Sequence, residues 1–261
     1  MLKNQAHCYP LQHILKQEVM LLATKVLFPV GTSESCKSAA DFLSRSGFLL
    51  TDHPSPDVTH LLLDIPSIQN DGLQELLRML PTDITILGYN PTADYLESCR
   101  KIDLQKDPLF LARNAAITAE CAIRVAAPYL TATFSESPTL ILGWGRIGKC
   151  LANLLQKIGT PVTIAARKES DRAIAIALGH RAVDFSEIQQ EATRHRLLFN
   201  TVPQGIVLQK PSPGCVKIDL ASLPGLEGED VIPARGLPGK FAPESAGKLI
   251  AESIIRLTRE E

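Results

Sequence analysis

TLILGWGRIG, residues 139–148, joins a short apolar run to three glycines in the pattern G-x-G-x-x-G. In such a turn the first glycine permits a tight bend, the second lets the backbone approach a pyrophosphate, and the third lets a helix pack closely on a strand. The phosphates then lie against the free N–H groups at the helix N-terminus. Glycines at this spacing also occur by chance, so the flanking sequence decides whether the turn binds a nucleotide.

The residues on the C-terminal side of the turn support a nucleotide site. Apolar side chains recur at helical spacing over residues 151–158, and Gly159 suits the end of that helix. Residues 161–166 then predict a second strand. Strand, turn, helix and strand in register favour a dinucleotide-binding unit over a generic α/β turn. We expect the cofactor to contact Gly143, Trp144, Gly145, Arg146, Ile147 and Gly148.

The tip of the second strand indicates which dinucleotide binds. A site for NAD carries Asp or Glu there, about 20 residues beyond the glycines, to bind the ribose 2′-hydroxyl. This chain has Arg167 and Lys168 instead, with Ser170 two residues further on. Two cations and a hydroxyl suit a 2′-phosphate, so we expect NADP. Because an arginine can also stack on adenine without contacting the phosphate, NAD is the alternative.

Composition excludes several classes of function. The 261 residues are 45% hydrophobic, which is enough for two domains. A net charge of −1 creates no basic field for nucleic acid or an anionic membrane surface. The six cysteines form no C-x-x-C pair and match no histidine spacing, so we expect reduced thiols, no metal site and a cytoplasmic protein. We expect no membrane span, and a small molecule as the ligand.

The first hundred residues alternate predicted strands and helices. Strands are expected at residues 25–30, 58–65 and 84–87. This alternation predicts a parallel sheet with right-handed crossovers, and so a small doubly wound domain. The hydroxyls of residues 32–35 suit either an anion or a simple helix N-cap, and we favour the cap. Apolar spacing also favours a helix within residues 1–24.

A long Ala- and Leu-rich helix, residues 107–131, is predicted between this domain and the glycine turn. A helix of this length can join two domains and line the cleft between them. Asn114 and Thr118 share one of its faces because they are four residues apart, and Glu120 lies on another. The helix therefore offers two neutral hydrogen-bonding groups to the same side.

Two further predicted strands end in polar residues. Ligands of open parallel sheets bind beyond the carboxyl ends of the strands, so we expect cofactor contacts from these ends. Asn200 and Thr201 suit the nicotinamide ribose, with an ordinary turn leading into Pro203 as the alternative. The loop at residues 236–240 is either a flexible cover over the nicotinamide or a sharp turn. The expected contacts are Asn200, Thr201, Val202, Ala221 and Ser222.

Several of these motifs resemble the A subunit of dipicolinate synthase. NAAITAECAI, residues 114–123, resembles the inter-domain helix of that family, although Ile117 and Cys121 replace a usual proline and glycine. The family's first strand is followed by a Gly-Gly-Asp-x-Arg turn, and here the arginine is missing from PVGTSE, residues 29–34. The other matching motifs are ILGWGRIG at 141–148, AARK at 165–168, NTVP at 200–203, IDLAS at 218–222 and GLPGKFAPESAG at 236–247.

The resemblance implies an α/β fold with two Rossmann-like, doubly wound parallel-sheet domains and a nicotinamide cofactor in the cleft between them. We expect the first domain over residues 1–112 and the dinucleotide-binding domain over 113–242, with the connecting helix at 113–131. The resemblance also implies that a C-terminal helix, residues 243–261, returns to the first domain.

The same resemblance implies an activity and partners. The expected reaction is oxidation of a dihydrodipicolinate-type precursor to pyridine-2,6-dicarboxylate during endospore formation, and the expected partner is a flavoprotein B subunit. We also expect a homo-oligomer. The alternative is a regulatory or scaffold protein, derived from such an enzyme, that binds the dinucleotide without turnover.

A dicarboxylate substrate needs cations or hydroxyls for its carboxylates and a base for the departing proton. Thr118, Ser222, Lys240 and the hydroxyls of residues 32–35 are the candidates for the carboxylates. Glu120 is the candidate base, and its alternative role is an ion pair with Arg124 one helical turn away.

Overall fold

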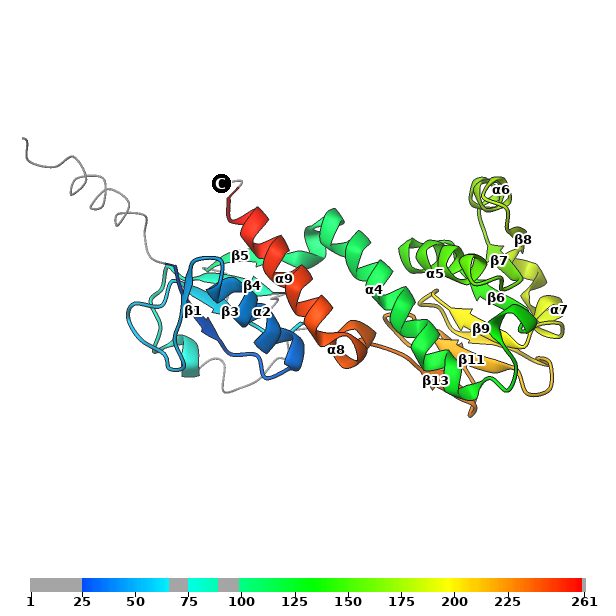
Figure 1. Cartoon of the computed structure of the whole chain (residues 1–261), viewed down its shortest axis with the longest axis horizontal. Helices are drawn as coiled ribbons and strands as arrows, with labels where there is room; N and C mark the ends of the chain where they lie inside the picture. The colour runs from blue at the N-terminus through cyan, green and yellow to red at the C-terminus, as the bar shows by residue number, and fades with distance from the viewer. Residues whose placement is uncertain (1–24, 66–74, 89–98, 260–261) are drawn as a thin grey trace, which may run out of the picture.

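The computed structural model describes residues 25–65, 75–88 and 99–259. The helix expected within residues 1–24 lies outside them. The described chain forms two parallel sheets, each with its own helices, and two long helices run between the two sheets (Figure 1). The α/β fold with two parallel sheets is therefore confirmed.

The first sheet has the strand order β2-β1-β3-β4-β5, and all its strands are parallel. This is the flavodoxin-like order, in which the chain reverses direction across the sheet between β1 and β3. Loops at that reversal point are where such sheets bind ligands. The strands are β1 (Lys25–Pro29), β2 (Phe48–Leu50), β3 (His60–Leu62), β4 (Thr85–Gly88) and β5 (Arg100–Asp103), and helix α2 (Glu34–Ser44) follows β1.

The second sheet has the order β13-β11-β9-β6-β7-β8 and is also parallel throughout. Read from the β8 edge and numbered along the chain, this is 3-2-1-4-5-6, the doubly wound order that binds dinucleotides where the strand order reverses, between the paired strands β6 and β9. The strands are β6 (Thr139–Leu142), β7 (Val162–Ala166), β8 (Arg181–Asp184), β9 (Leu197–Asn200), β11 (Val216–Asp219) and β13 (Val231–Pro233); β10 (Ile206–Val207) and β12 (Leu226–Glu227) form a separate pair.

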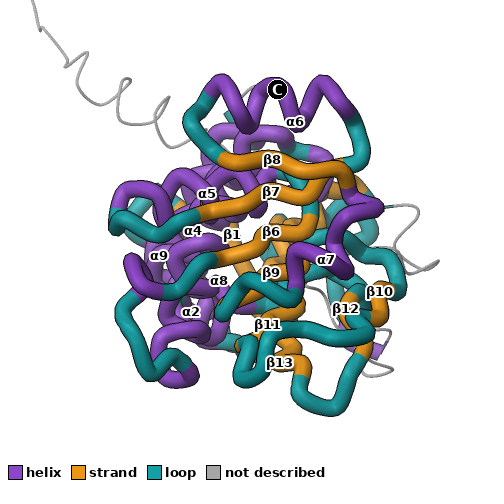
Figure 2. Tube along the Cα trace, turned by 90° about the vertical axis from the view of Figure 1, so that its right-hand side faces the viewer, coloured by secondary structure: helices purple, strands orange, loops and turns teal. Residues whose placement is uncertain are grey.

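Helices cover both faces of the second sheet. Figure 2 shows α4 and α5 on one side of it and α7 on the other. Apolar side chains pack beneath each layer, with Leu151 and Leu155 on the α5 side and Ile188 on the α7 side. The described α-helices that follow α2 in the chain, on either sheet, are α4 (Pro108–Ala126), α5 (Arg146–Lys157), α6 (Glu169–Ala177), α7 (Ile188–Ala192), α8 (Leu237–Phe241) and α9 (Pro243–Leu257).

Helix α4 is shared between the two sheets. Asp107 caps it by accepting hydrogen bonds from the backbone of Leu109 and Phe110, and Pro108 occupies its first turn. Phe110 belongs to the core of the first sheet, whereas Ala122 near the other end belongs to the core of the second. Because each end is buried against a different core, α4 sets the separation of the two sheets.

Helix α9 packs on the first sheet, beside α2 (Figure 1). Ile250 and Ile254 are buried in the same core as Leu27 of β1. Gly247 permits the close approach, since a Cβ there would lie 2.5 Å from the Cβ of Ser38. Arg256 donates a hydrogen bond to the Asp107 carboxylate at the start of α4.

An ion pair between a buried glutamate and a half-exposed arginine supports the edge of the second sheet. Arg181 donates from both terminal nitrogens to Glu191, whose side chain is 2% exposed. His195 bridges the backbone carbonyl of Glu191 and the hydroxyl of Thr163. Hydrogen bonding to Arg181 lowers the pKa of the Glu191 carboxyl below its ordinary value of 4.5. The carboxylate is therefore the form that stabilises this edge.

We predict that Glu191→Gln lowers the unfolding free energy by about 1–3 kcal/mol near neutral pH, because the amide cannot replace the charge-assisted pair. A lowered native pKa gives stability that is present above the unfolded value and lost as the pH falls through the native one. The deficit should therefore shrink below pH 4.5, the ordinary carboxyl value. Urea titrations at several pH values measure the unfolding free energy, with the exposed Glu229→Gln as control. A loss of stability that does not change with pH would show that the Glu191 carboxylate is not the stabilising form.

Candidate dinucleotide and substrate cleft

The glycine turn lies between β6 and α5, at the carboxyl end of β6, where the strand order reverses between β6 and β9. Gly143 has a φ of +102°, and a Cβ there would lie 2.5 Å from the Thr201 hydroxyl. Gly148 packs against the turn, because a Cβ there would lie 2.5 Å from the carbonyl oxygen of Gly143. Gly145 is different: no atom lies within 4 Å of a Cβ built on it. Two glycines are therefore required for packing, and the third leaves open space.

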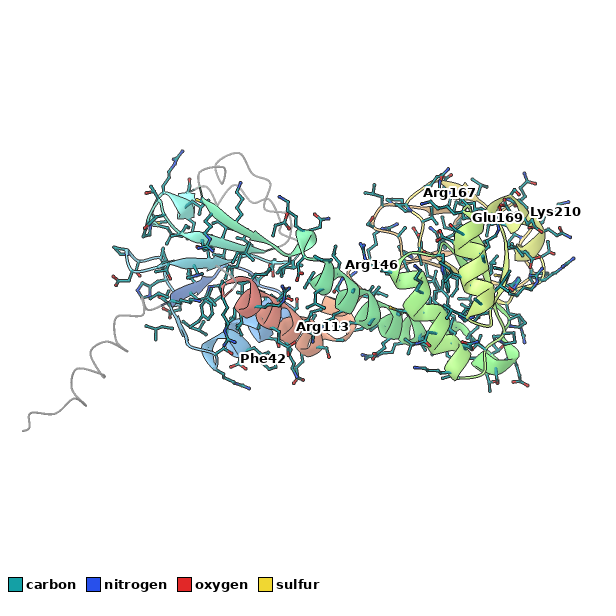
Figure 3. All side chains as sticks on the ribbon, turned by 90° about the horizontal axis from the view of Figure 1, so that it is seen from above. Phe42, Arg113, Arg146, Arg167, Glu169 and Lys210 are labelled. Carbon is teal, nitrogen blue, oxygen red and sulfur yellow. The ribbon has the colours of Figure 1, made fainter. Side chains whose placement is uncertain are left out.

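The residues present fit the diphosphate of a dinucleotide. Gly145 is the N-cap of α5, and no side chain caps this end of the helix. The first N–H groups of α5 are therefore available to a phosphate. Arg146 is exposed, and Figure 3 shows it on the side of the second sheet that faces the first. Trp144 packs inward: the residue is 6% exposed, and its ring centroid lies 5.7 Å from that of His180. Its backbone is thus the part available to a cofactor.

The tip of β7 carries the expected cations. Arg167, Lys168 and Ser170 are exposed, and Figure 3 shows Arg167 at the surface of the second sheet unit. Arg167 makes a long hydrogen bond of 3.4 Å to the side chain of Gln204, which follows β9. Its charge is therefore accessible beside the loop where a dinucleotide's ribose would lie.

The carboxyl ends of β9 and β11 are tied together by side chains. Asn200 is fully buried, donates to Asp219 (2.8 Å) and to the carbonyl of Val202, and accepts from the Val202 N–H (3.0 Å). Thr201 donates its hydroxyl to the carbonyl of Leu142 at 2.8 Å. Asn200 therefore forms the turn that was the alternative to a ribose contact, whereas Thr201 ties this loop to the end of β6.

A cleft of about 460 Å³ opens between the two sheets. It brings together Asn114 and Thr118 of α4, Ile147 of the glycine turn and Ser222 after β11. Glu120 and Lys240 are exposed and do not line it. The remaining lining residues are Ser35, Ile65, Phe110, Leu220, Ala221, Ala234, Arg235, Gly236, Leu237, Pro238, Gly239, Ala246 and Ile250.

Glu120 lies elsewhere for a helical reason. It follows Thr118 by two positions, which turns it about 200° around α4 and away from the cleft. Arg124 does not form the expected ion pair with it in the described chain: its guanidinium donates to the carbonyl of Phe241 and lies 5.6 Å from that ring. The structure therefore gives Glu120 neither of the two roles considered for it.

The loop at residues 236–240 forms a helical turn, α8. Gly236 precedes it with a φ of +65°, and Leu237 is 2% exposed within the core of the second sheet. The segment is thus a packed wall of the cleft.

The turn after β1 is satisfied by the protein itself. The backbone N–H groups of Thr32 and Ser33 donate to the Asp64 carboxylate at 2.9 and 3.1 Å, and Ser33 caps α2 by accepting from Cys36. Ser35 is buried against the cleft. Burial raises the pKa of the Cys36 thiol to about 12, so it stays protonated. The cap expected for this loop is observed, and Asp64 takes the position of an anion.

Arg235 is a site residue that sequence analysis missed. Among the described residues that line the cleft it is the only charged one. Its Nη2 donates to Asp219 at 2.6 Å, across 16 positions of sequence. The signal available in the sequence was its place directly before the motif at residues 236–247. Nothing in the pattern paired it with an acid.

The described residues contain no group of three or more His, Cys, Asp or Glu side chains that could hold a metal ion. No described helix is long and apolar enough to cross a membrane. Three features remain. They are a glycine turn where the strand order of one parallel sheet reverses, a second parallel sheet, and a cleft between the two sheets. Together they define a two-sheet Rossmann-like fold of the kind that binds dinucleotides.

Comparison with known proteins agrees with this class. The sequence matches no protein-family model. It is similar to the A subunit of dipicolinate synthase from Bacillus subtilis (strain 168), with 29% identity over an alignment of 159 residues that covers 56% of this chain and 54% of that protein. The match thus spans about half the length of the relative. The predicted resemblance to this family is confirmed.

Solved structures show the same fold over nearly the whole chain. The A subunit of dipicolinate synthase from Bacillus halodurans superposes with a TM-score of 0.78 at 21% identity, covering 90% of this chain and 97% of that one. The Bacillus subtilis structure gives 0.78 at 20% identity, covering 91% and 96%. A transhydrogenase from Sinorhizobium meliloti gives 0.67 at 12% identity, covering 90% and 94%.

Proposed function

We propose that this chain is an NADP-dependent oxidoreductase subunit that converts a dihydrodipicolinate-type precursor to pyridine-2,6-dicarboxylate in spore-forming cells. The observation that carries the proposal is the cleft. It is lined by Ile147 of the glycine turn, by neutral polar side chains of α4 and by Arg235. A flat ring with carboxylates suits a cleft that is mostly apolar with polar groups at a few positions. The similarity to the A subunit of dipicolinate synthase supports the substrate class.

The cofactor-binding residues divide between the two ends of the dinucleotide. The backbone from Gly143 to Gly148 would hold the diphosphate on α5. Arg167, Lys168 and Ser170 would bind the adenosine ribose phosphate. The bound nicotinamide supplies a hydride acceptor, and Ala221 and Ser222 beside Ile147 would orient it in the cleft.

The substrate would lie against α4. Asn114 offers an amide donor there, and the Thr118 hydroxyl, which donates its proton to the carbonyl of Asn114 at 2.8 Å, would have to turn toward the substrate to donate to it. We assign no proton acceptor to Glu120 or Lys240, since neither lines the cleft. The proposed domain boundaries are residues 1–112, with the C-terminal helix, and 113–242. A flavoprotein partner and a cytoplasmic homo-oligomer complete the proposal.

Purified protein mixed with NADP⁺ and enzymatically generated dihydrodipicolinate should form pyridine-2,6-dicarboxylate, followed by its ultraviolet absorbance. The assay is run with and without a flavoprotein partner. A second candidate, a dinucleotide-binding regulatory protein, is favoured by Asp64, whose carboxylate fills the anion position of the first sheet. Tight NADPH binding with no product under either condition would favour that candidate.

Arg167→Asp should raise the dissociation constant for NADPH about 10–100-fold, since charge-assisted hydrogen bonds to a phosphate contribute about 1.5–3 kcal/mol. NADH binding should change much less, because NADH carries no 2′-phosphate. Nicotinamide fluorescence measures both constants. Lys210→Asp makes the same exposed charge change at another position of the second sheet unit (Figure 3). Equal loss for both cofactors, or a native preference for NADH, would contradict the role of Arg167.

A further inference from the structure

We propose that Arg235 binds one carboxylate of the substrate in this cleft and that Asp219 holds the guanidinium in place. The inference rests on the proposed function, and it assigns a specificity residue that no motif pointed to. It also places the anion-binding wall of the cleft on the second sheet.

The charge distribution of the cleft is the first argument. Its described lining is apolar or neutral apart from Arg235, whose side chain is 33% exposed. An ionised carboxylate taken from water into such a cleft is strongly disfavoured unless a cation pairs with it. Among the described lining residues, Arg235 is the group able to do so. An arginine also presents its N–H groups in a planar fork that matches a carboxylate.

The way Arg235 is held is the second argument. Asp219 is 3% exposed and receives hydrogen bonds from the Gly225 N–H (3.0 Å), the Asn200 amide (2.8 Å) and Arg235 Nη2 (2.6 Å). This network holds the Nη2 end of the guanidinium. The Nε of Arg235 is buried and has no hydrogen-bond partner within the described chain. The protein therefore positions the group without using all of its donors.

The opposite wall provides the third argument. The turn after β1 already holds the Asp64 carboxylate on the N–H groups of Thr32 and Ser33. A ligand carboxylate placed there would meet like charge. Ser35 offers a neutral hydroxyl on that side instead, and Asn114 of α4 offers an amide. The cleft is thus asymmetric, with one ionic contact from Arg235 and hydrogen bonds alone for a second carboxylate.

The test compares Arg235→Gln with native protein saturated with NADPH. Calorimetric titration with pyridine-2,6-dicarboxylate, pyridine-2-carboxylate and pyridine-2-carboxamide separates charge from shape. Native protein should bind pyridine-2-carboxylate at least tenfold more tightly than the carboxamide, and Arg235→Gln should abolish that difference while its NADPH dissociation constant stays within twofold. Arg259→Gln, a change at another exposed arginine, should behave as native.

Arg235→Gln leaves the Asp219 carboxylate buried without its cation, so the double variant Arg235→Gln with Asp219→Asn removes both charges and is used if the single variant fails to fold. Unchanged carboxylate binding in either folded variant overturns the assignment and leaves the proposed function standing. Loss of NADPH binding would instead make Arg235 a cofactor residue and also overturn it. Native protein that binds neither carboxylate overturns the proposed function together with this inference.

Discussion

Gly145→Ala should weaken dinucleotide binding about 10–100-fold and leave the fold nearly unchanged. A Cβ at this position meets no protein atom within 4 Å, and the backbone φ of −81° is ordinary for alanine. The methyl group would instead enter the space where a diphosphate approaches the α5 N-terminus, and such overpacking typically costs about 1–3 kcal/mol. NADPH titration by fluorescence measures the loss, and thermal unfolding monitored by circular dichroism checks the fold.

Gly148→Ala is the matched comparison, because the same methyl group there meets protein. Its Cβ would lie 2.5 Å from the backbone oxygen of Gly143, so α5 must move away from β6. We expect this variant to lose about 1–3 kcal/mol of stability as well as binding. A Gly145→Ala protein that binds NADPH as tightly as native would show that the open space is not the diphosphate site.

Gly247→Leu should destabilise the first sheet by about 3 kcal/mol or more, since a buried contact between two helices has no room for a large side chain. A Cβ there already lies 2.5 Å from the Cβ of Ser38 and 2.8 Å from the backbone nitrogen of Ala39. The change would push α9 away from α2 and expose Ile250 and Ile254. Urea unfolding followed by far-ultraviolet circular dichroism measures the effect.

Ser245→Leu is the control, because it adds the same side chain to an exposed position of α9. Its unfolding midpoint should stay close to the native one. Trp144, the single tryptophan, lies in the core of the second sheet and reports that unit separately by fluorescence. A native midpoint for Gly247→Leu would show that α9 is not held tightly against α2.

Much of the second sheet could be predicted from the sequence, and the two edge strands of the first sheet could not. Strands β6, β7 and β9 are buried along their whole length and are apolar at all but one position each, so hydrophobic runs and flanking glycines are sufficient to find them. Strands β2 and β5 were missed because they are three or four residues long and each buries a single side chain, Phe48 and Ile102. A short edge strand is defined by the neighbour it pairs with, which local sequence does not contain.

The sequence by itself determined the nucleotide turn and its basic strand tip. Glycines act through backbone geometry that is local, and Arg167 follows its strand directly, so both could be read from adjacent residues. The tertiary structure decided the chemistry of the cleft. Arg235 meets Asp219 because β11 and β13 are neighbours, and the Asp64 carboxylate reaches the turn at Ser33 because β1 and β3 pair. Those contacts depend on which strands lie side by side, and that order is set by the packing of the whole chain.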